Sequence, residues 1–149
     1  MDQPTAGEAL ARLEPLVGEW VLEAAGADGT PWPGEGRVTF AWHESGAHLV
    51  ERGTVDVPEA PDNVSIIGCD GANGTYYQLY SDERGVCRVY RMSIGDGRWE
   101  LLREGEPFDQ RFVGVFSDDG NTITGRWEIA EDGGAYATDF HLTYRRVHT

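Results

Sequence analysis

Apolar and polar side chains alternate along most of the chain, beginning at Glu19. An alternation with period two, rich in β-branched and aromatic residues, is typical of strands that bury one face. Gly, Asp and Asn interrupt it at regular intervals and so divide it into ten runs. We therefore predict ten β-strands, over residues 19–26, 36–43, 47–57, 63–70, 74–81, 86–94, 97–104, 110–118, 121–130 and 135–147.

The chain before Glu19 has a helical spacing instead. Thr5 and Glu8 stand at the spacing of a capping box, and Pro15 limits the run. Four apolar residues recur at helical intervals from residue 6 to residue 17, namely Ala6, Leu10, Leu13 and Val17. This pattern predicts one short helix over about residues 6–14. Such a helix is marginal alone, so we expect it to lie across one end of a larger structure.

Most connections between the predicted strands are short turns, at 70–74, 82–85, 95–97, 118–121 and 131–134. Parallel strands need crossovers of about a dozen residues or more, so the sheet must be an antiparallel meander. Closure into a barrel removes the two open edges of such a sheet, and a barrel of eight or more strands can hold a small ligand. We predict an all-β meander barrel as a single domain over residues 1–149. Two longer connections remain, and Trp32 in the first of them can fold over the mouth of a cavity.

Composition narrows the range of partners. The chain of 149 residues has 26 Asp and Glu against 12 Lys and Arg, a formal charge of −14. This charge repels nucleic acid and anionic lipid surfaces, so we expect neither as a partner. We find no apolar run of the ~20 residues that a membrane helix needs and no secretory leader, which predicts a cytoplasmic protein. Cys69 and Cys87 fall on strands separated by a third, too far apart for a disulfide, so we predict free thiols.

Gly18-Glu19-Trp20, on the first predicted strand, resembles the G-x-W motif of the calycin superfamily, which includes lipocalins, fatty-acid-binding proteins and nitrobindins. Over nearly its whole length the chain is similar to an uncharacterised bacterial lipocalin-like family. The segments that carry this likeness are 16–20, 49–52, 89–93, 116–128 and 139–144. The resemblance implies a calycin-like barrel of about ten strands with one short N-terminal helix.

The last predicted strand, 142–147, resembles the final strand of fatty-acid-binding proteins, in which an inward-facing Tyr helps to hold the ligand carboxylate. Tyr144 matches that residue. The family has an Arg two residues earlier, where this chain has Leu142.

Binding of a small apolar or amphipathic molecule inside the barrel is the function that this reasoning favours, without a cofactor. Aromatic side chains on the strands can line an apolar pocket, although core packing is their commoner use. If Tyr76, Gln78 and Tyr80 share an inward face, Arg88 supplies a polar end; Arg91 takes that role if the parity is reversed. The candidate ligand-binding residues are Trp20, Trp42, Tyr80, Arg88, Tyr90, Trp99, Trp127 and Tyr144.

Alternatives remain open at this point. His141-Leu142 resembles the haem-binding His-Leu of nitrobindins, which implies haem as a cofactor through His141, although an outward-facing histidine is the commoner case. The segment from His43 to His48 misses the zinc-protease motif by one residue and predicts a surface hairpin. A small-molecule cyclase or isomerase is a further alternative, with Glu51 and Tyr144 as acid–base candidates. Two further alternatives are an interaction protein that uses the barrel exterior and a homodimer.

Overall fold

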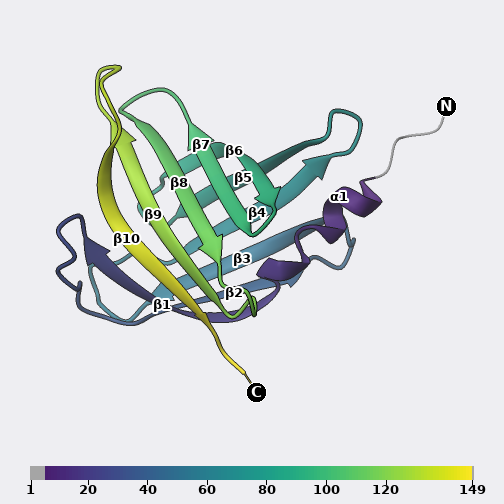
Figure 1. Ribbon diagram of the computed structural model, residues 1–149, viewed down its shortest axis with the longest axis horizontal. Coiled ribbons are helices and arrows are strands. Elements are labelled where there is room, and N and C mark those ends of the chain that lie inside the picture. The colour runs from purple at the N-terminus through teal and green to yellow at the C-terminus, as the bar shows by residue number, and fades with distance from the viewer. Residues whose placement is uncertain (1–5, 149) are drawn as a thin grey trace.

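The computed structural model describes residues 6–148, and it is a closed barrel of ten antiparallel strands (Figure 1). Each strand pairs with its neighbours in the sequence, and β1 pairs with β10 to close the ring. Every predicted strand is confirmed, with bounds that shift by at most two residues. The strands are β1 (Gly18–Gly26), β2 (Gly36–Trp42), β3 (His48–Val55), β4 (Asn63–Asp70), β5 (Thr75–Asp82), β6 (Cys87–Gly95), β7 (Arg98–Arg103), β8 (Asp109–Phe116), β9 (Thr122–Ala130) and β10 (Ala137–Arg146).

The N-terminal helix is shorter than the predicted 6–14. It consists of α1 (Gly7–Ala11), followed by a 3₁₀ turn, η1 (Glu14–Leu16). Pro15 has no backbone N–H to continue an α-helical ladder, and the tighter turn takes over there. Ala6 is the N-cap and makes no side-chain cap, while Thr5 of the predicted capping box lies outside the described residues. Within residues 6–148, no helix is long and apolar enough to cross a membrane.

The N-terminal segment that holds α1 and η1, here called the lead-in segment, closes one end of the barrel, as expected. Leu13, Leu16 and Trp20 are fully buried there, and the Tyr76 hydroxyl donates a hydrogen bond to the Ala9 carbonyl at 2.6 Å. Because the strands run antiparallel, the longer connections at 27–35 and 56–62 both fall at the opposite end, as the ribbon shows (Figure 1). The barrel therefore has a closed end and an open end.

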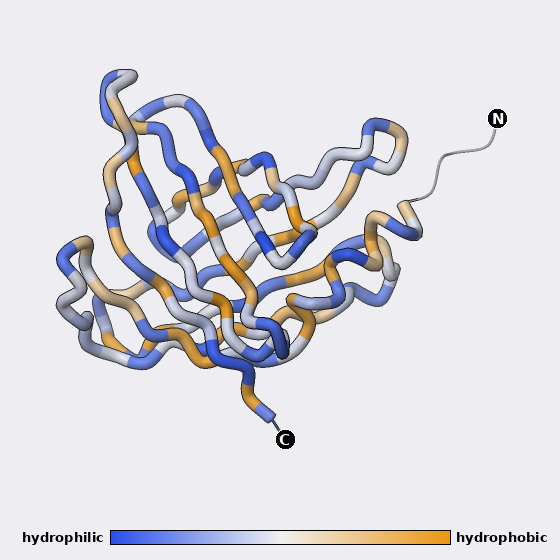
Figure 2. Tube along the Cα trace, in the orientation of Figure 1, coloured by the Kyte–Doolittle hydropathy of each residue, from blue (hydrophilic) through white to orange (hydrophobic). Residues whose placement is uncertain are grey.

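Of the two parities that the sequence left open, the structure has the one in which Tyr76, Gln78 and Arg88 face inward. Hydrophobic and hydrophilic positions alternate along the trace (Figure 2), and the inward positions of β5 and β6 include buried Tyr76, Gln78, Tyr90 and Met92. The predicted free thiols are confirmed as well: Cys69 on β4 and Cys87 on β6 are separated by β5 and form no disulfide. A reliable parity decides which side chains can reach a cavity.

Candidate functional site

A cavity of about 470 Å³ occupies the open half of the barrel. Its wall is mainly apolar and aromatic, with Leu22, Trp99, Leu101, Phe112, Trp127 and Leu142 among the lining side chains. Residues 32–34 of the β1–β2 connection and Val57 of the β3–β4 connection form its rim. This volume falls in the usual range for small-molecule pockets, about 300–1,000 Å³.

Trp32 lies at this rim, where the sequence led us to expect it. Its ring packs on that of Phe140, with centroids 5.0 Å apart, and its backbone N–H donates to the Ala24 carbonyl at 2.9 Å. The side chain is 47% exposed. Trp32 therefore covers part of the mouth while one face stays in contact with solvent.

A carboxyl group is buried among these apolar walls. Glu51 on β3 lines the cavity and is 9% exposed. Among residues 6–148, no side chain forms an ion pair or hydrogen bond with it. Burial raises its pKa from the ordinary 4.5 to about 7, because a low-dielectric surrounding disfavours the charged form. A carboxyl with a pKa near neutrality can accept or release a proton at physiological pH, as the acid–base alternative requires.

Tyr144 on β10 lines the same cavity and is 6% exposed. The pKa of its hydroxyl is raised well above the usual value, first by burial and then by the negative charge of Glu51. The two groups that we singled out from the sequence as acid–base candidates thus share one cavity. Turnover of a substrate stays a prediction.

Two further polar groups here lack partners. Gln78 on β5 donates from Nε2 to Ser65 Oγ at 3.2 Å. Its Oε1 and the indole Nε1 of Trp99 are the buried side-chain atoms without a hydrogen-bond partner in the described part of the chain. Both residues line the cavity. Buried polar groups are nearly always satisfied, so these two atoms, one acceptor and one donor, call for an explanation.

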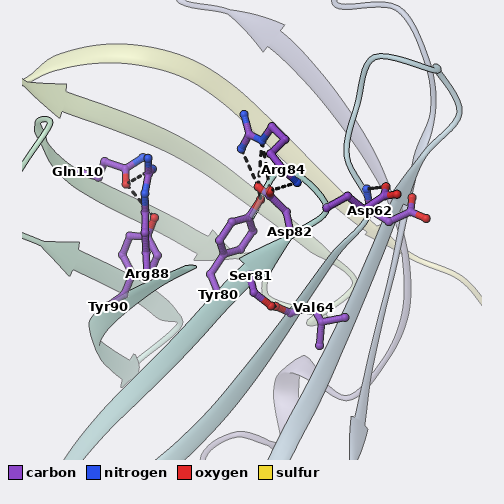
Figure 3. Close-up of polar contacts among 10 residues, drawn as sticks. Asp62, Val64, Tyr80, Ser81, Asp82, Arg84, Arg88, Tyr90 and Gln110 are labelled. Carbon is purple, nitrogen blue, oxygen red and sulfur yellow. Dashed lines mark hydrogen bonds and ion pairs between the residues drawn. The ribbon is translucent and has the colours of Figure 1, made fainter. Parts of the chain in front are cut away.

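A polar network stands at the mouth of the cavity (Figure 3). The Tyr80 hydroxyl donates to Asp82 Oδ2 at 2.7 Å, and Arg84 Nη2 donates to the same oxygen at 2.7 Å. The hydrogen bond from Arg84 is the main cause that lowers the pKa of Asp82, and burial followed by the bond to Asp82 raises the pKa of Tyr80. Arg84 is therefore neutralised by a neighbour on its own turn.

The structure brings half of the predicted ligand-binding residues to the cavity. Tyr80, Trp99, Trp127 and Tyr144 line it. Trp20 and Trp42 point inward at the closed end instead: Trp20 Nε1 donates to the Leu16 carbonyl, and Trp42 Nε1 donates to Glu14 Oε1, each at 2.9 Å. The indole N–H groups of both residues therefore bond to the lead-in segment that closes this end.

Arg88 and Tyr90 share the inward face of β6 but do not line the cavity. Arg88 Nη1 and the Tyr90 hydroxyl both donate to Gln110 Oε1, at 2.9 and 2.8 Å (Figure 3). Tyr90 also packs edge-on against Trp127. The predicted polar end at Arg88 is thus satisfied within the protein, and Arg91 points outward to pair with Glu104 at 2.7 Å.

His141 lies apart from the barrel cavity. It lines a second pocket, together with Thr143 and Glu23, whereas its neighbours Phe140 and Leu142 line the cavity. No histidine occurs among the described residues that line the cavity, so its lining does not fit a histidine-ligated haem. Haem ligation by His141 stays a prediction. His43 and His48 stack across a turn at 4.6 Å, as a surface hairpin predicts, and no metal-ligand cluster occurs within residues 6–148.

Gln78, Phe112 and Arg84 are site residues that sequence reasoning missed. The strand face shared by Gln78 with Tyr76 and Tyr80 was a usable signal, because an amide on an otherwise aromatic inward face is costly unless it has a role. Phe112 carries no such signal, since an inward-facing Phe is an ordinary core residue.

On the outer face of the barrel, three exposed apolar side chains lie side by side on β4, β5 and β6. They are Ile66, Leu79 and Val89, which are 42, 39 and 56% exposed.

No protein-family model and no curated protein matches this chain. Among solved structures, the chain is similar to the crystal structure of Rv2717c from M. tuberculosis, with a TM-score of 0.63 and 16% sequence identity. The match covers 99% of this chain and 100% of that one. At this identity the likeness bears on the fold alone, which in this chain is a closed barrel of ten antiparallel strands.

Proposed function

We propose that this protein binds a small, largely apolar molecule with a polar group inside its barrel. The observation that carries the proposal is the combination, in one cavity, of aromatic walls with buried polar atoms that have no protein partner, Gln78 Oε1 and Trp99 Nε1. An unsatisfied buried polar group costs about 1–3 kcal/mol, and a bound ligand that pairs with it removes that cost.

The shape of the cavity supports the same proposal. Leu13, Leu16 and Trp20 fill the closed end, whereas the open half leaves about 470 Å³. A barrel that served only as a scaffold would gain stability by filling this space, since empty core volume is destabilising. The resemblance of the sequence to calycins, which include ligand-holding fatty-acid-binding proteins, points in the same direction.

A neutral fluorescent probe, N-phenyl-1-naphthylamine, tests the proposal, because its emission rises in an apolar site. We expect saturable binding to the wild-type protein. Ala24 lines the cavity from β1, and Ala24→Phe should weaken binding at least tenfold by filling the space. Ala41→Phe, on the exposed outer face of β2, is the matched control and should leave binding unchanged.

The outcomes separate the alternatives. Equal binding by both variants, with circular dichroism spectra like that of the wild type, would place the probe outside the barrel and overturn the proposal. The absorption spectrum after addition of haemin, with His141→Ala as control, examines the haem alternative independently. A Soret band lost in that variant would favour haem in the second pocket over a ligand in the cavity.

A further inference from the structure

Beside the unpartnered donor Trp99 Nε1, the cavity holds more acceptor atoms than donors, namely Gln78 Oε1 and the two carboxyl oxygens of Glu51. Glu51, Ser65 and Gln78 lie on the adjacent strands β3, β4 and β5, and Glu51 and Ser65 are direct cross-strand partners. All three are buried, at 9, 0 and 5% exposure. Ser65 Oγ accepts from Gln78 Nε2, and Gln78 Oε1 has no donor in the described chain. No side-chain hydrogen bond or ion pair joins Glu51 to another of residues 6–148.

Within residues 6–148, no cationic side chain pairs with Glu51. The cationic residues among the described cavity lining are Arg37 and Arg84. Arg84 pairs with Asp82 at 2.7 Å, and Arg37 Nη1 pairs with Glu19 at 3.2 Å. A buried carboxyl group without a partner cation is costly when ionised. The missing charge must therefore come from a proton or from a ligand.

Aromatic rings lie near Glu51: Trp99 and Tyr144 line the cavity, and Phe40 packs behind the wall against Trp99. Phe40 is the cross-strand partner of Glu51 on β2, and its ring lies 6.0 Å from that of Trp99, edge to face. Trp99 in turn lies 5.8 Å from Tyr144, whose pKa the charge of Glu51 raises. Aromatic rings beside a carboxylate are the surroundings that recognise organic cations.

We propose that the ligand is an amphipathic amine, whose ammonium group pairs with Glu51 and donates to Gln78 Oε1 while its apolar body lies between Trp127 and the mouth. This inference rests on the proposed function. An ammonium group carries three donors and no acceptor, which matches the excess of acceptors. A carboxylate ligand would meet the charge of Glu51, and the formal charge of −14 also disfavours its approach.

Three ligands that share a linear eight-carbon chain and differ in the head group test the assignment, namely octylamine, 1-octanol and octanoate. Each is titrated by calorimetry at pH 8 and moderate salt, where octylamine is protonated, because alkyl amines have a pKa of about 10.4 or above. We expect octylamine to bind about tenfold more tightly than octanol, and octanoate to bind least tightly. Glu51→Gln should weaken octylamine binding about tenfold and leave octanol binding within about twofold.

Glu44→Gln is the control for surface charge. Its side chain is 91% exposed in the turn after β2, at the closed end, and it removes the same charge as Glu51→Gln. Octylamine binding should not change in this variant. Retained octanol binding reports that the Glu51→Gln barrel is folded.

The results distinguish the two proposals. Octanol binding as tight as octylamine binding, or octylamine binding unchanged in Glu51→Gln, overturns the amine assignment and leaves the proposed function in place. Failure of all three ligands, while N-phenyl-1-naphthylamine still binds in the cavity, does the same. Failure of all four compounds overturns both proposals.

Discussion

The guanidinium of Arg146 lies over the ring of Trp20, with its central carbon 4.2 Å from the ring centroid. Arg146 Nη1 donates to the Val17 carbonyl at 2.6 Å and Nη2 to the Pro15 carbonyl at 2.7 Å. Because Trp20 and Arg146 are paired across β1 and β10, this contact joins the closing seam of the barrel to the segment that closes its end. The Trp of the G-x-W motif thus supports the closed end of the barrel, opposite the cavity.

Arg146→Lys should lower the free energy of unfolding by about 2 kcal/mol, because a lysine cannot reproduce the planar fork that serves these carbonyls. Arg145→Lys is the matched control: Arg145 points outward, pairs with Glu23 at 3.5 Å, and should change stability by less than about 0.5 kcal/mol. Urea unfolding measures both variants. Equal losses would contradict a special role for the contact with Trp20.

Two glycines make room for the Phe112 ring in the cavity wall. Gly114 and Gly125 are cross-strand partners on β8 and β9, and a Cβ at Gly125 would lie 2.7 Å from Phe112 Cε1 and 2.9 Å from the Leu142 carbonyl oxygen. Gly125→Ala should therefore destabilise the fold by about 1–3 kcal/mol through overpacking. Gly7→Ala, in open space on α1, should be neutral or stabilising by up to about 1 kcal/mol. Thermal and urea unfolding of both variants check this pair, and a neutral Gly125→Ala would refute the overpacking argument.

The buried Glu51 makes stability depend on pH. Its pKa is about 7 in the fold against an ordinary 4.5, so the folded state binds more protons than the unfolded state between these values. Stability therefore falls as pH rises from about 4.5 to 7 and stays reduced above that range. Tyr144 on β10 is the titratable group that faces Glu51, with uncharged Phe40 and Ser65 beside it on β2 and β4.

Glu51→Gln removes this dependence. The stability of the variant relative to the wild type should increase by about 3 kcal/mol between pH 4 and pH 8, since each pKa unit corresponds to about 1.4 kcal/mol. Other carboxylates cancel in the difference between the two proteins. Urea unfolding at pH 4, 6 and 8 measures it, and a difference that is constant with pH would show that Glu51 is not buried as a neutral acid.

The architecture could be predicted from the sequence, because strand parity and turn chemistry are local properties. The same parity correctly placed Tyr144 inside, whereas the burial of Glu51 follows only from the fold. The depth of a side chain along the barrel axis is not a local property. Trp20 and Trp42 face inward like Trp99, but they lie at the closed end, which the lead-in segment fills. Hydrogen-bond partners are not a local property either. Gln110, which accepts the hydrogen bond of Arg88, lies on β8, and β7 separates that strand from β6. The role of Gln78 was missed for the same reason, because the hydrogen bond that orients its side chain is donated to Ser65 on the neighbouring strand β4.

Trp32 should control access to the cavity. It covers the mouth through its contact with Phe140, and an aromatic pair contributes about 0.5–1.5 kcal/mol beyond burial. Trp32→Ala should therefore weaken N-phenyl-1-naphthylamine binding about three- to tenfold, chiefly through faster dissociation. The free energy of unfolding should fall by only about 0.5–1.5 kcal/mol, the contribution of the lost pair with Phe140, because the side chain is half exposed. Trp42→Phe, which loses the hydrogen bond to Glu14 and part of the ring at the closed end, is the control and should bind the probe as the wild type does. Stopped-flow dissociation measures both variants. A rate unchanged in Trp32→Ala would mean that ligands pass elsewhere, whereas equal acceleration in both variants would mean that the rate follows general loosening of the barrel.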